Sequence, residues 1–274
     1  MLTPAQVEAY RRDGYHFPVD ILSPVETATY RQKLETYEAG TDGPIKGNLR
    51  QKPHLLFTWL NTLIRHPKIL DAVEAIHGPD LLCWSSSFFI KEPQHAGYVS
   101  WHQDSTYWGL SSPDVITVWL AFTPADAING AMKFLPGSQH TQAPHTDTFH
   151  EHNLLSRGQE LAVEVDENKS VLVALNPGQV SLHHVMLYHG SAPNRSADRR
   201  IGFAIRYIPT HVRQIAGARD AATLVRGVDR FQHFDPEPAP EYDLAPAAVA
   251  THTAIMRQQA QILYRGTGKE EFRA

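Results

Sequence analysis

The chain has 274 residues, of which 42% are hydrophobic and 20% charged, so we expect a sizeable buried core. A net charge of −4 without a long basic run argues against nucleic acid and anionic membranes as partners. The sequence shows no signal-peptide pattern and no apolar stretch of membrane-spanning length, and its one cysteine, Cys83, has no disulfide partner. These features favour a cytoplasmic protein, and we expect a monomer or homodimer.

Helices are predicted in the first quarter of the chain. Thr3-Pro4-Ala5-Gln6 and Ser23-Pro24-Val25-Glu26 each combine an N-cap hydroxyl, a proline in the first turn and a side chain that completes a capping box. Gly14 supplies a stop for the first helix, and a turn-rich connection follows the second. The predicted helices cover about residues 4–13, 23–39, 55–64 and 68–76.

Short runs rich in β-forming residues, bounded by Gly, Pro, Asn and Asp, follow the helices. They do not alternate with helices, which argues against a doubly wound parallel sheet and favours a double-stranded β-helix, the jelly roll of cupin-like proteins. The predicted strands cover residues 81–90, 115–122, 131–135, 171–175, 179–184 and 201–208.

The last part of the chain is irregular and rich in Pro and charge up to about residue 245, and a helix is predicted from Pro246 to about Tyr264. We therefore expect one domain over residues 1–274, mainly β with flanking helices. Its expected parts are a helical segment (about 1–77), a jelly-roll core (about 80–210) and an irregular lid with a C-terminal helix (about 211–264).

The most informative motif is His102-Gln103-Asp104, followed far downstream by His189-Gly190-Ser191. Two histidines and one carboxylate in this order have the sequence form of the facial triad, which binds non-haem Fe(II) by one face and leaves the other positions open. On an extended segment, His102 and Asp104 would leave the same face. A bare His-x-Asp match is common by chance in a chain with 16 histidines, so the interpretation depends on its surroundings.

Other histidines compete for the metal. His183 and His184 alternate on a predicted strand, so one of them is expected to face inward, as a contact behind the ligands or with substrate. A further cluster lies in a polar segment that is interpreted as a solvated or lid segment, because ligands on loops lack rigid support. This cluster consists of His140, His145, His150 and His152.

A predicted strand from Arg200 to Arg206 carries two different faces. With a period of two, Arg200, Gly202, Ala204 and Arg206 share one face, and bulky apolar residues share the other. The small residues suggest space for a non-protein group, and Arg200 could clamp a carboxylate in bidentate fashion. The alternative is an exposed strand face with ordinary surface arginines.

Together these motifs resemble the phytanoyl-CoA dioxygenase family of Fe(II)/2-oxoglutarate oxygenases. The resemblance rests on Trp101–Asp104, on Asn129–His140 and on the segment from His189 to Arg200. It implies that His102, Asp104 and His189 bind iron and that Arg200 pairs with the far carboxylate of 2-oxoglutarate.

The resemblance also implies roles around this centre. Ser191 matches a hydroxyl near that carboxylate, Trp119 an aromatic beside the cosubstrate, and Lys91 a lysine that helps to bind cosubstrate or substrate. Trp108 matches an aromatic residue that lines the substrate side in some relatives.

The function implied by the resemblance is a dioxygenase that hydroxylates a small metabolite with Fe(II), 2-oxoglutarate and O2. Halogenases of the family lack the carboxylate ligand, so the presence of Asp104 favours hydroxylation. Desaturation, epimerisation, cyclisation and carbon–heteroatom cleavage stay open as alternatives, as does a non-catalytic metal-binding or sensor protein.

Three segments are candidates for lids or pocket walls: Gly43–Trp59, His140–Gly158 and Arg219–Phe234. In the first and third, basic residues lie close to aromatic ones, which suits a polar or anionic small molecule; Trp59 and Arg226 are therefore candidates for substrate contact. The alternative is surface charge over buried aromatic side chains.

Overall fold

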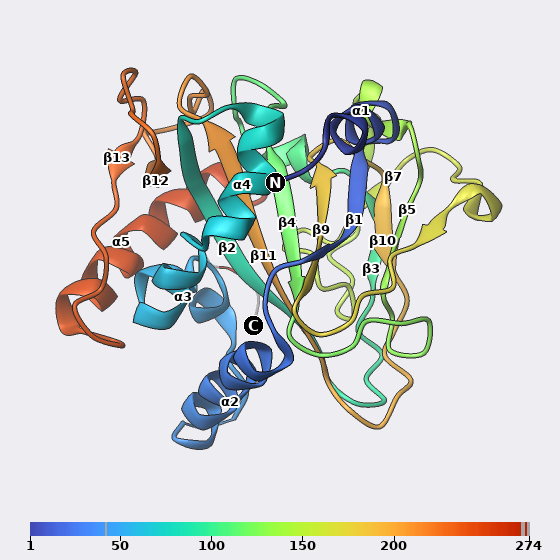
Figure 1. Cartoon of the computed structure of the whole chain (residues 1–274), viewed down its shortest axis with the longest axis horizontal. Helices are drawn as coiled ribbons and strands as arrows, with labels where there is room; N and C mark the ends of the chain where they lie inside the picture. Colours follow the sequence, from blue (N-terminus) through green and yellow to red (C-terminus); the bar gives the residue numbers. More distant parts are fainter. Residues whose placement is uncertain (42, 270–271, 273–274) are drawn as a thin grey trace.

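Two sheets face each other in the computed structural model, which describes residues 1–41, 43–269 and 272 (Figure 1). Within this part of the chain, the larger sheet has the order β1-β9-β4-β11-β2-β12-β13 and the smaller one the order β3-β10-β5-β8. The layers have the jelly-roll arrangement that the strand pattern predicts. The apolar side chains between them include Trp119, Ala204, Met132 and Phe134.

The strand bounds are as follows. The larger sheet contains β1 (Tyr15–Asp20), β2 (Leu81–Lys91), β4 (Ile116–Ala121), β9 (Gln179–His184), β11 (Arg200–Pro209), β12 (Ala221–Arg226) and β13 (Asp235–Pro236). The smaller sheet contains β3 (Val99–His102), β5 (Met132–Phe134), β8 (Val171–Leu172) and β10 (His189–Ser191). A separate pair consists of β6 (His145–Asp147) and β7 (Gln159–Leu161).

Helices cover the outer face of the larger sheet. Both predicted capping boxes form, at Thr3 with Gln6 and at Ser23 with Glu26, and Gly14 ends the first helix in the left-handed conformation. Figure 1 shows α4 in front of the sheet, α3 and α2 towards its lower end, and α5 near β12 and β13. The helices are α1 (Pro4–Asp13), α2 (Pro24–Ala39), α3 (Thr58–Leu63), α4 (Pro67–His77) and α5 (Pro246–Leu263). None of those described is long and apolar enough to cross a membrane.

Strand β11 confirms the predicted alternation. Ile201, Phe203 and Ile205 are fully buried in the core beneath the helices. The other face, from Arg200 to Arg206, lines a cavity between the sheets. The exposed-face alternative for this strand is therefore wrong.

The structure also differs from the predicted elements. β1 was not predicted, because Pro18 interrupts the run; a proline is tolerated there because β1 is an edge strand. The strands β3 and β10 have four and three residues and are too short for a periodic signal. The expected lid Arg219–Phe234 contains β12, which is hydrogen-bonded to β2, so its first half belongs to the sheet.

Candidate metal centre

His102, Asp104 and His189 meet at the end of two paired strands of the smaller sheet. His102 ends β3 and lies opposite His189, the first residue of β10. The His-x-Asp motif is extended through Gln103, as expected; the β-strand itself stops at His102, and Asp104 opens a 3-10 turn. The Asp104 N–H donates to the carbonyl of Val185 at 3.0 Å, which fixes the start of that turn.

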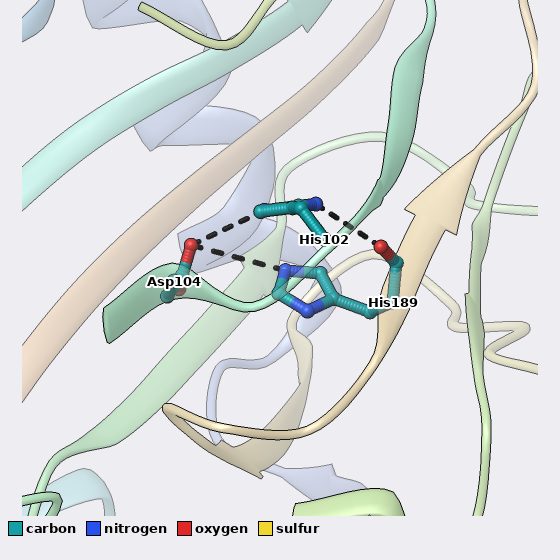
Figure 2. Close-up of side chains that lie close together, drawn as sticks. All are labelled: His102, Asp104 and His189. Carbon is teal, nitrogen blue, oxygen red and sulfur yellow. Dashed lines mark hydrogen bonds and ion pairs between the residues drawn. The ribbon is translucent and has the colours of Figure 1, made fainter. Parts of the chain in front are cut away.

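The three side chains point toward one another (Figure 2). Nε2 of His102 lies 3.3 Å from Oδ1 of Asp104, and Nε2 of His189 lies 4.0 Å from the same oxygen. One potential ligand atom from each residue falls within a 4.8 Å span, and all three residues are buried. Among the described residues this is the one group of three or more His, Cys, Asp or Glu side chains with such spacing.

Backbone carbonyls determine which nitrogen of each imidazole faces the centre. Nδ1 of His102 lies 2.9 Å from the carbonyl of Ser100 and 3.0 Å from that of His189, and Nδ1 of His189 lies 2.9 Å from the carbonyl of Leu187. A carbonyl only accepts, so each Nδ1 carries a proton and each Nε2 is the ring nitrogen that faces the centre. Two imidazoles and a carboxylate whose donor atoms converge in this way fit a transition metal bound by one face.

The electrostatics agree with this ligand set. Burial lowers the pKa of His189 to about 4, so its imidazole is neutral at pH 7. Burial by itself would raise the pKa of Asp104, but the hydrogen bond with His102 and the charge of Arg206 outweigh burial and hold this pKa below its usual value. Asp104 is therefore ionised, as a metal ligand must be.

An inner cavity of about 30 Å³ connects these side chains with the arginine face of β11. Ser191 and Trp119, which the sequence assigned to cosubstrate binding, line this cavity as well. Its wall contains the residues Phe89, Val99, His102, Asp104, Thr117, Trp119, Met132, His183, His189, Gly190, Ser191, Arg200, Ala204 and Arg206.

One end of the inner cavity is basic. Arg200 is 1% exposed, its guanidinium donates to the carbonyl of Gly130, and burial lowers its pKa to about 9, which leaves it charged at pH 7. Lys91 lies opposite Arg200 on β2 and donates from Nζ to Oγ of Ser191 at 2.7 Å. Burial, and then the charge of Arg200, lowers the pKa of Lys91 to about 6. At pH 7 the positive charge at this end therefore comes from Arg200, and a buried guanidinium suits a carboxylate.

Trp119 lies against this basic end because Gly202 leaves room for it. The Arg200 guanidinium carbon is 5.2 Å from the centre of the Trp119 ring. A Cβ at position 202 would lie 1.9 Å from the same ring. The small residues on this face of β11 therefore make space for an aromatic side chain beside the arginine.

The structure shows which of the two histidines on β9 faces inward. His183 is 1% exposed and faces the inner cavity, with its ring centre 4.9 Å from that of His189. His184 is half-buried, and its Nδ1 accepts from the backbone of Met186. His183 is thus the inward member, and it lies outside the group of three ligand residues.

An outer cavity of about 160 Å³ adjoins the inner one, and Phe89, Asp104 and Arg206 line both. Trp108, the aromatic residue assigned to the substrate side, lines the outer cavity. Two further walls come from Glu151–Ser156, inside the expected lid 140–158, and from the end of α5. The sequence did not predict that Arg206 and α5 line this cavity. For Arg206, the signal that could have indicated it is its position on the same strand face as Arg200.

Two substrate assignments are wrong. Trp59 is 6% exposed and packs against Phe57 in the core under the helices. Its aromatic surface is used for core packing, so it cannot contact a substrate. Arg226 forms ion pairs with Asp71 and Glu74 on α4 at 2.8 and 2.6 Å. Neither residue lines the inner or the outer cavity.

Only part of the expected lid 43–59 lines a cavity, and another part is buried in the fold. Arg50 and Gln51 line the outer cavity. Lys52 and His54 are fully buried instead and contact Glu237, so they cannot reach a ligand in that cavity.

The histidines of the polar segment have separate surroundings. Nε2 of His145 accepts from the backbone N–H of Gln103 at 2.9 Å, which supports the His-x-Asp motif from behind. His150 and His152 are exposed, with ring centres 5.6 Å apart. His140 is exposed too and ends a short 3-10 helix.

The chain is similar to known proteins. The family model of phytanoyl-CoA dioxygenase matches residues 2–202. A probable alpha-ketoglutarate-dependent hypophosphite dioxygenase of Stutzerimonas stutzeri is 30% identical over 165 residues, which cover 57% of this chain and 55% of that protein. The chain thus matches about half the length of this curated relative.

Two solved structures resemble the whole fold. The apo form of the non-heme monooxygenase ThoJ superposes with a TM-score of 0.85 at 35% identity, covering 95% of this chain and 98% of ThoJ. CytC3 with Fe(II) and alpha-ketoglutarate superposes with a TM-score of 0.67 at 25% identity, covering 89% and 97%. The chain belongs to the phytanoyl-CoA dioxygenase family, whose fold and cofactors, Fe(II) and 2-oxoglutarate, are those expected from the sequence.

Proposed function

We propose that this protein is an Fe(II)- and 2-oxoglutarate-dependent dioxygenase that hydroxylates a C–H bond of a small metabolite and releases succinate and CO2. The observation that carries the proposal is one cavity lined by His102, Asp104 and His189 together with Arg200. A metal-binding protein without turnover would need no buried arginine beside its metal centre.

The residues have separate roles in this proposal. His102, Asp104 and His189 hold the iron, and Arg200 pairs with the far carboxylate of 2-oxoglutarate, where Ser191 and Lys91 lie close by. The bound iron supplies the activation of O2, coupled to oxidative decarboxylation of the cosubstrate. The side chains orient the reactants and exclude water, because a displaced C–H bond would waste the oxidant.

The substrate would occupy the outer cavity. This cavity reaches Asp104 but not Arg200, so a molecule in it approaches the metal centre without displacing the cosubstrate. Trp108 forms part of its wall and contacts Trp84, with ring centres 4.9 Å apart. The size and the aromatic wall suit a small metabolite rather than a polymer.

The same site would also support desaturation, epimerisation, cyclisation or carbon–heteroatom cleavage, since the outcome depends on where the substrate lies relative to the metal. Hydroxylation is preferred because the carboxylate ligand Asp104 is present, and because the similar ThoJ is described as a monooxygenase.

Anaerobic titration with Fe(II) and 2-oxoglutarate tests the proposal. We expect a weak visible charge-transfer band, which reports chelation of the cosubstrate by the metal. A screen of metabolite pools for substrate-stimulated succinate formation, read by mass spectrometry, then tests turnover. A protein that binds Fe(II) without this band and forms no succinate would be a metal-binding protein and not a dioxygenase.

A further inference from the structure

Arg206 occupies the passage between the two cavities. It lies on the same face of β11 as Arg200, six positions along the strand, or about 20 Å at 3.3 Å per residue. Arg206 lines both cavities, whereas Arg200 lines only the inner one. Both arginines thus belong to the wall of the inner cavity, and of the two only Arg206 also lines the outer cavity.

The guanidinium of Arg206 is buried and forms no ion pair with a described carboxylate, although Asp104 favours its charged form. The residue is 6% exposed, its Nη1 donates to Oγ of Ser87, and its Nε has no hydrogen-bond partner in the described part of the chain. No described carboxylate forms an ion pair with it, although Arg157 and Arg199 pair with Asp147 and Glu38. Burying a cation without an ion-pair partner lowers the stability of the fold, because the charge loses its hydration. A protein therefore keeps such a group where a bound ligand supplies the anion.

The surroundings of Arg206 also favour an anion. Its guanidinium carbon lies 5.6 Å from the ring centres of Phe89 and Trp108, which hold the planar group without neutralising it. Arg50 adds a second basic side chain to the wall of the outer cavity.

The described acidic residues in the wall of the outer cavity have other partners or are exposed. Asp220 accepts from Trp84 Nε1 at 2.7 Å and from Gln259. Glu151 is exposed, and the charge of Asp104 would be used by the metal.

We infer that Arg206 binds an oxyanion group of the substrate, so that the substrate is a small molecule with a carboxylate or a phosphorus oxyanion. The inference rests on the proposed function. Two anions would then be held on one strand face, the cosubstrate by Arg200 and the substrate by Arg206. The oxidised position would lie between the oxyanion and the metal centre.

The test measures anion binding without turnover. Protein loaded anaerobically with Ni(II) and saturated with 2-oxoglutarate is titrated calorimetrically with sodium hypophosphite and, separately, with sodium acetate. Wild type is compared with Arg206→Met, with Arg206→Lys and with the exposed-arginine control Arg195→Met. Melting temperatures are recorded for all four proteins.

At least one probe should bind about 30- to 150-fold more weakly to Arg206→Met, the loss expected for a bidentate charge-assisted pair. Arg206→Lys should show an intermediate loss, and Arg195→Met none. If hypophosphite binding is weakened, the substrate group is a phosphorus oxyanion; if acetate binding is weakened, it is a carboxylate. Because the cation forms no ion pair with the carboxylates that the structure describes, Arg206→Met should melt no lower than wild type; if it does not fold, Arg206→Lys alone decides.

Equal binding of both probes to wild type and to the Arg206 variants overturns the inference. So does a substrate from the metabolite screen that carries no oxyanion and keeps its Michaelis constant in Arg206→Lys. The proposed function is judged separately by the charge-transfer band of wild type with Fe(II) and 2-oxoglutarate. Its absence would overturn both proposals, whereas its presence with unchanged probe binding overturns only the role of Arg206.

Discussion

Each histidine of the metal centre is oriented by a backbone carbonyl rather than by a side chain. The carbonyls of Ser100 and Leu187 accept the Nδ1 protons of His102 and His189; Ser100 belongs to β3, and Leu187 lies two residues before β10. Removing an imidazole therefore removes a ligand without disturbing the other one. This separation allows the ligands to be tested singly.

His189→Ala should lose tight Fe(II) binding, because two remaining protein ligands no longer define a face of the metal. His183→Ala should keep its metal, since His183 packs against the His189 ring and is not one of the three proposed ligands. Turnover of His183→Ala should fall by about 10- to 100-fold, as is typical for contacts behind metal ligands. Metal content and succinate release are measured for both, with the half-buried His184→Ala as control. Metal-free His183→Ala with iron retained in His189→Ala would reverse the assignment.

Arg200→Ala should raise the Michaelis constant for 2-oxoglutarate and leave iron binding nearly intact. A bidentate charge-assisted pair contributes roughly 2–3 kcal/mol, which corresponds to about a 30- to 150-fold change. Steady-state kinetics with varied 2-oxoglutarate measure the effect, and Arg195→Ala, an exposed arginine in the preceding loop, is the control. An unchanged Michaelis constant would remove Arg200 from the cosubstrate site.

At the scale of elements, β11 combines the core and the site. It is hydrogen-bonded to β2 and β4 on its two sides, so its conformation is fixed and its side chains alternate strictly between helices and cavity. The bulky face stabilises the fold while the other face carries two arginines separated by Gly202 and Ala204. Enlarging one of these two small residues should thus affect both the stability of the fold and the binding of the cosubstrate.

Gly202→Ala should destabilise the protein by about 1–3 kcal/mol, because the added methyl would overlap the Trp119 ring. The displaced ring should also raise the Michaelis constant for 2-oxoglutarate, since it lies beside Arg200. Urea denaturation and kinetics measure the two effects. Gly40→Ala is the matched control, because a Cβ there has its nearest neighbour at 3.5 Å. Equal stabilities of the two variants would show that Trp119 can move freely.

At the scale of the whole molecule, a buried ion pair joins segments that are far apart in the chain. Nζ of Lys52 lies 2.5 Å from Oε1 of Glu237, and both side chains are fully buried. Thr223 on β12 donates to the same carboxylate at 2.7 Å, and His54 lies 3.4 Å from it. The pair ties the segment that carries Arg50 to the strands at the edge of the larger sheet.

Glu237→Gln should destabilise the protein by about 3–5 kcal/mol at pH 7, because it leaves the Lys52 charge buried without a partner. Burial would raise the pKa of Glu237, but Lys52 and His54 lower it to about 2. The unfolded value is about 4.3, so the stabilisation is present above that pH and is lost as the pH falls towards 2. Denaturation curves at pH 7, 4 and 3 should therefore converge for wild type and variant. The exposed Glu164→Gln serves as control, and a difference that stays constant with pH would contradict the ion-pair account.

The sequence by itself determined the elements and residues whose signals are local. Capping boxes, the alternation of β11 and the His-x-Asp motif depend on neighbouring residues, so the helices, the central strand and the candidate ligands were predicted with their numbers. The family motifs added the cosubstrate residues that line the inner cavity, Ser191, Trp119 and Arg200.

Only the tertiary structure decided which of the remaining polar and aromatic residues face a cavity. Trp59 and Arg226 look like ligand contacts in the sequence, but one is buried in the core and the other is paired on the surface. Arg206 was recognised as a face partner of Arg200, yet its place between two cavities depends on α5 and on the segment 151–156 packing over the sheet. The physical reason is that a cavity is formed by residues distant in sequence, so no local pattern encodes it.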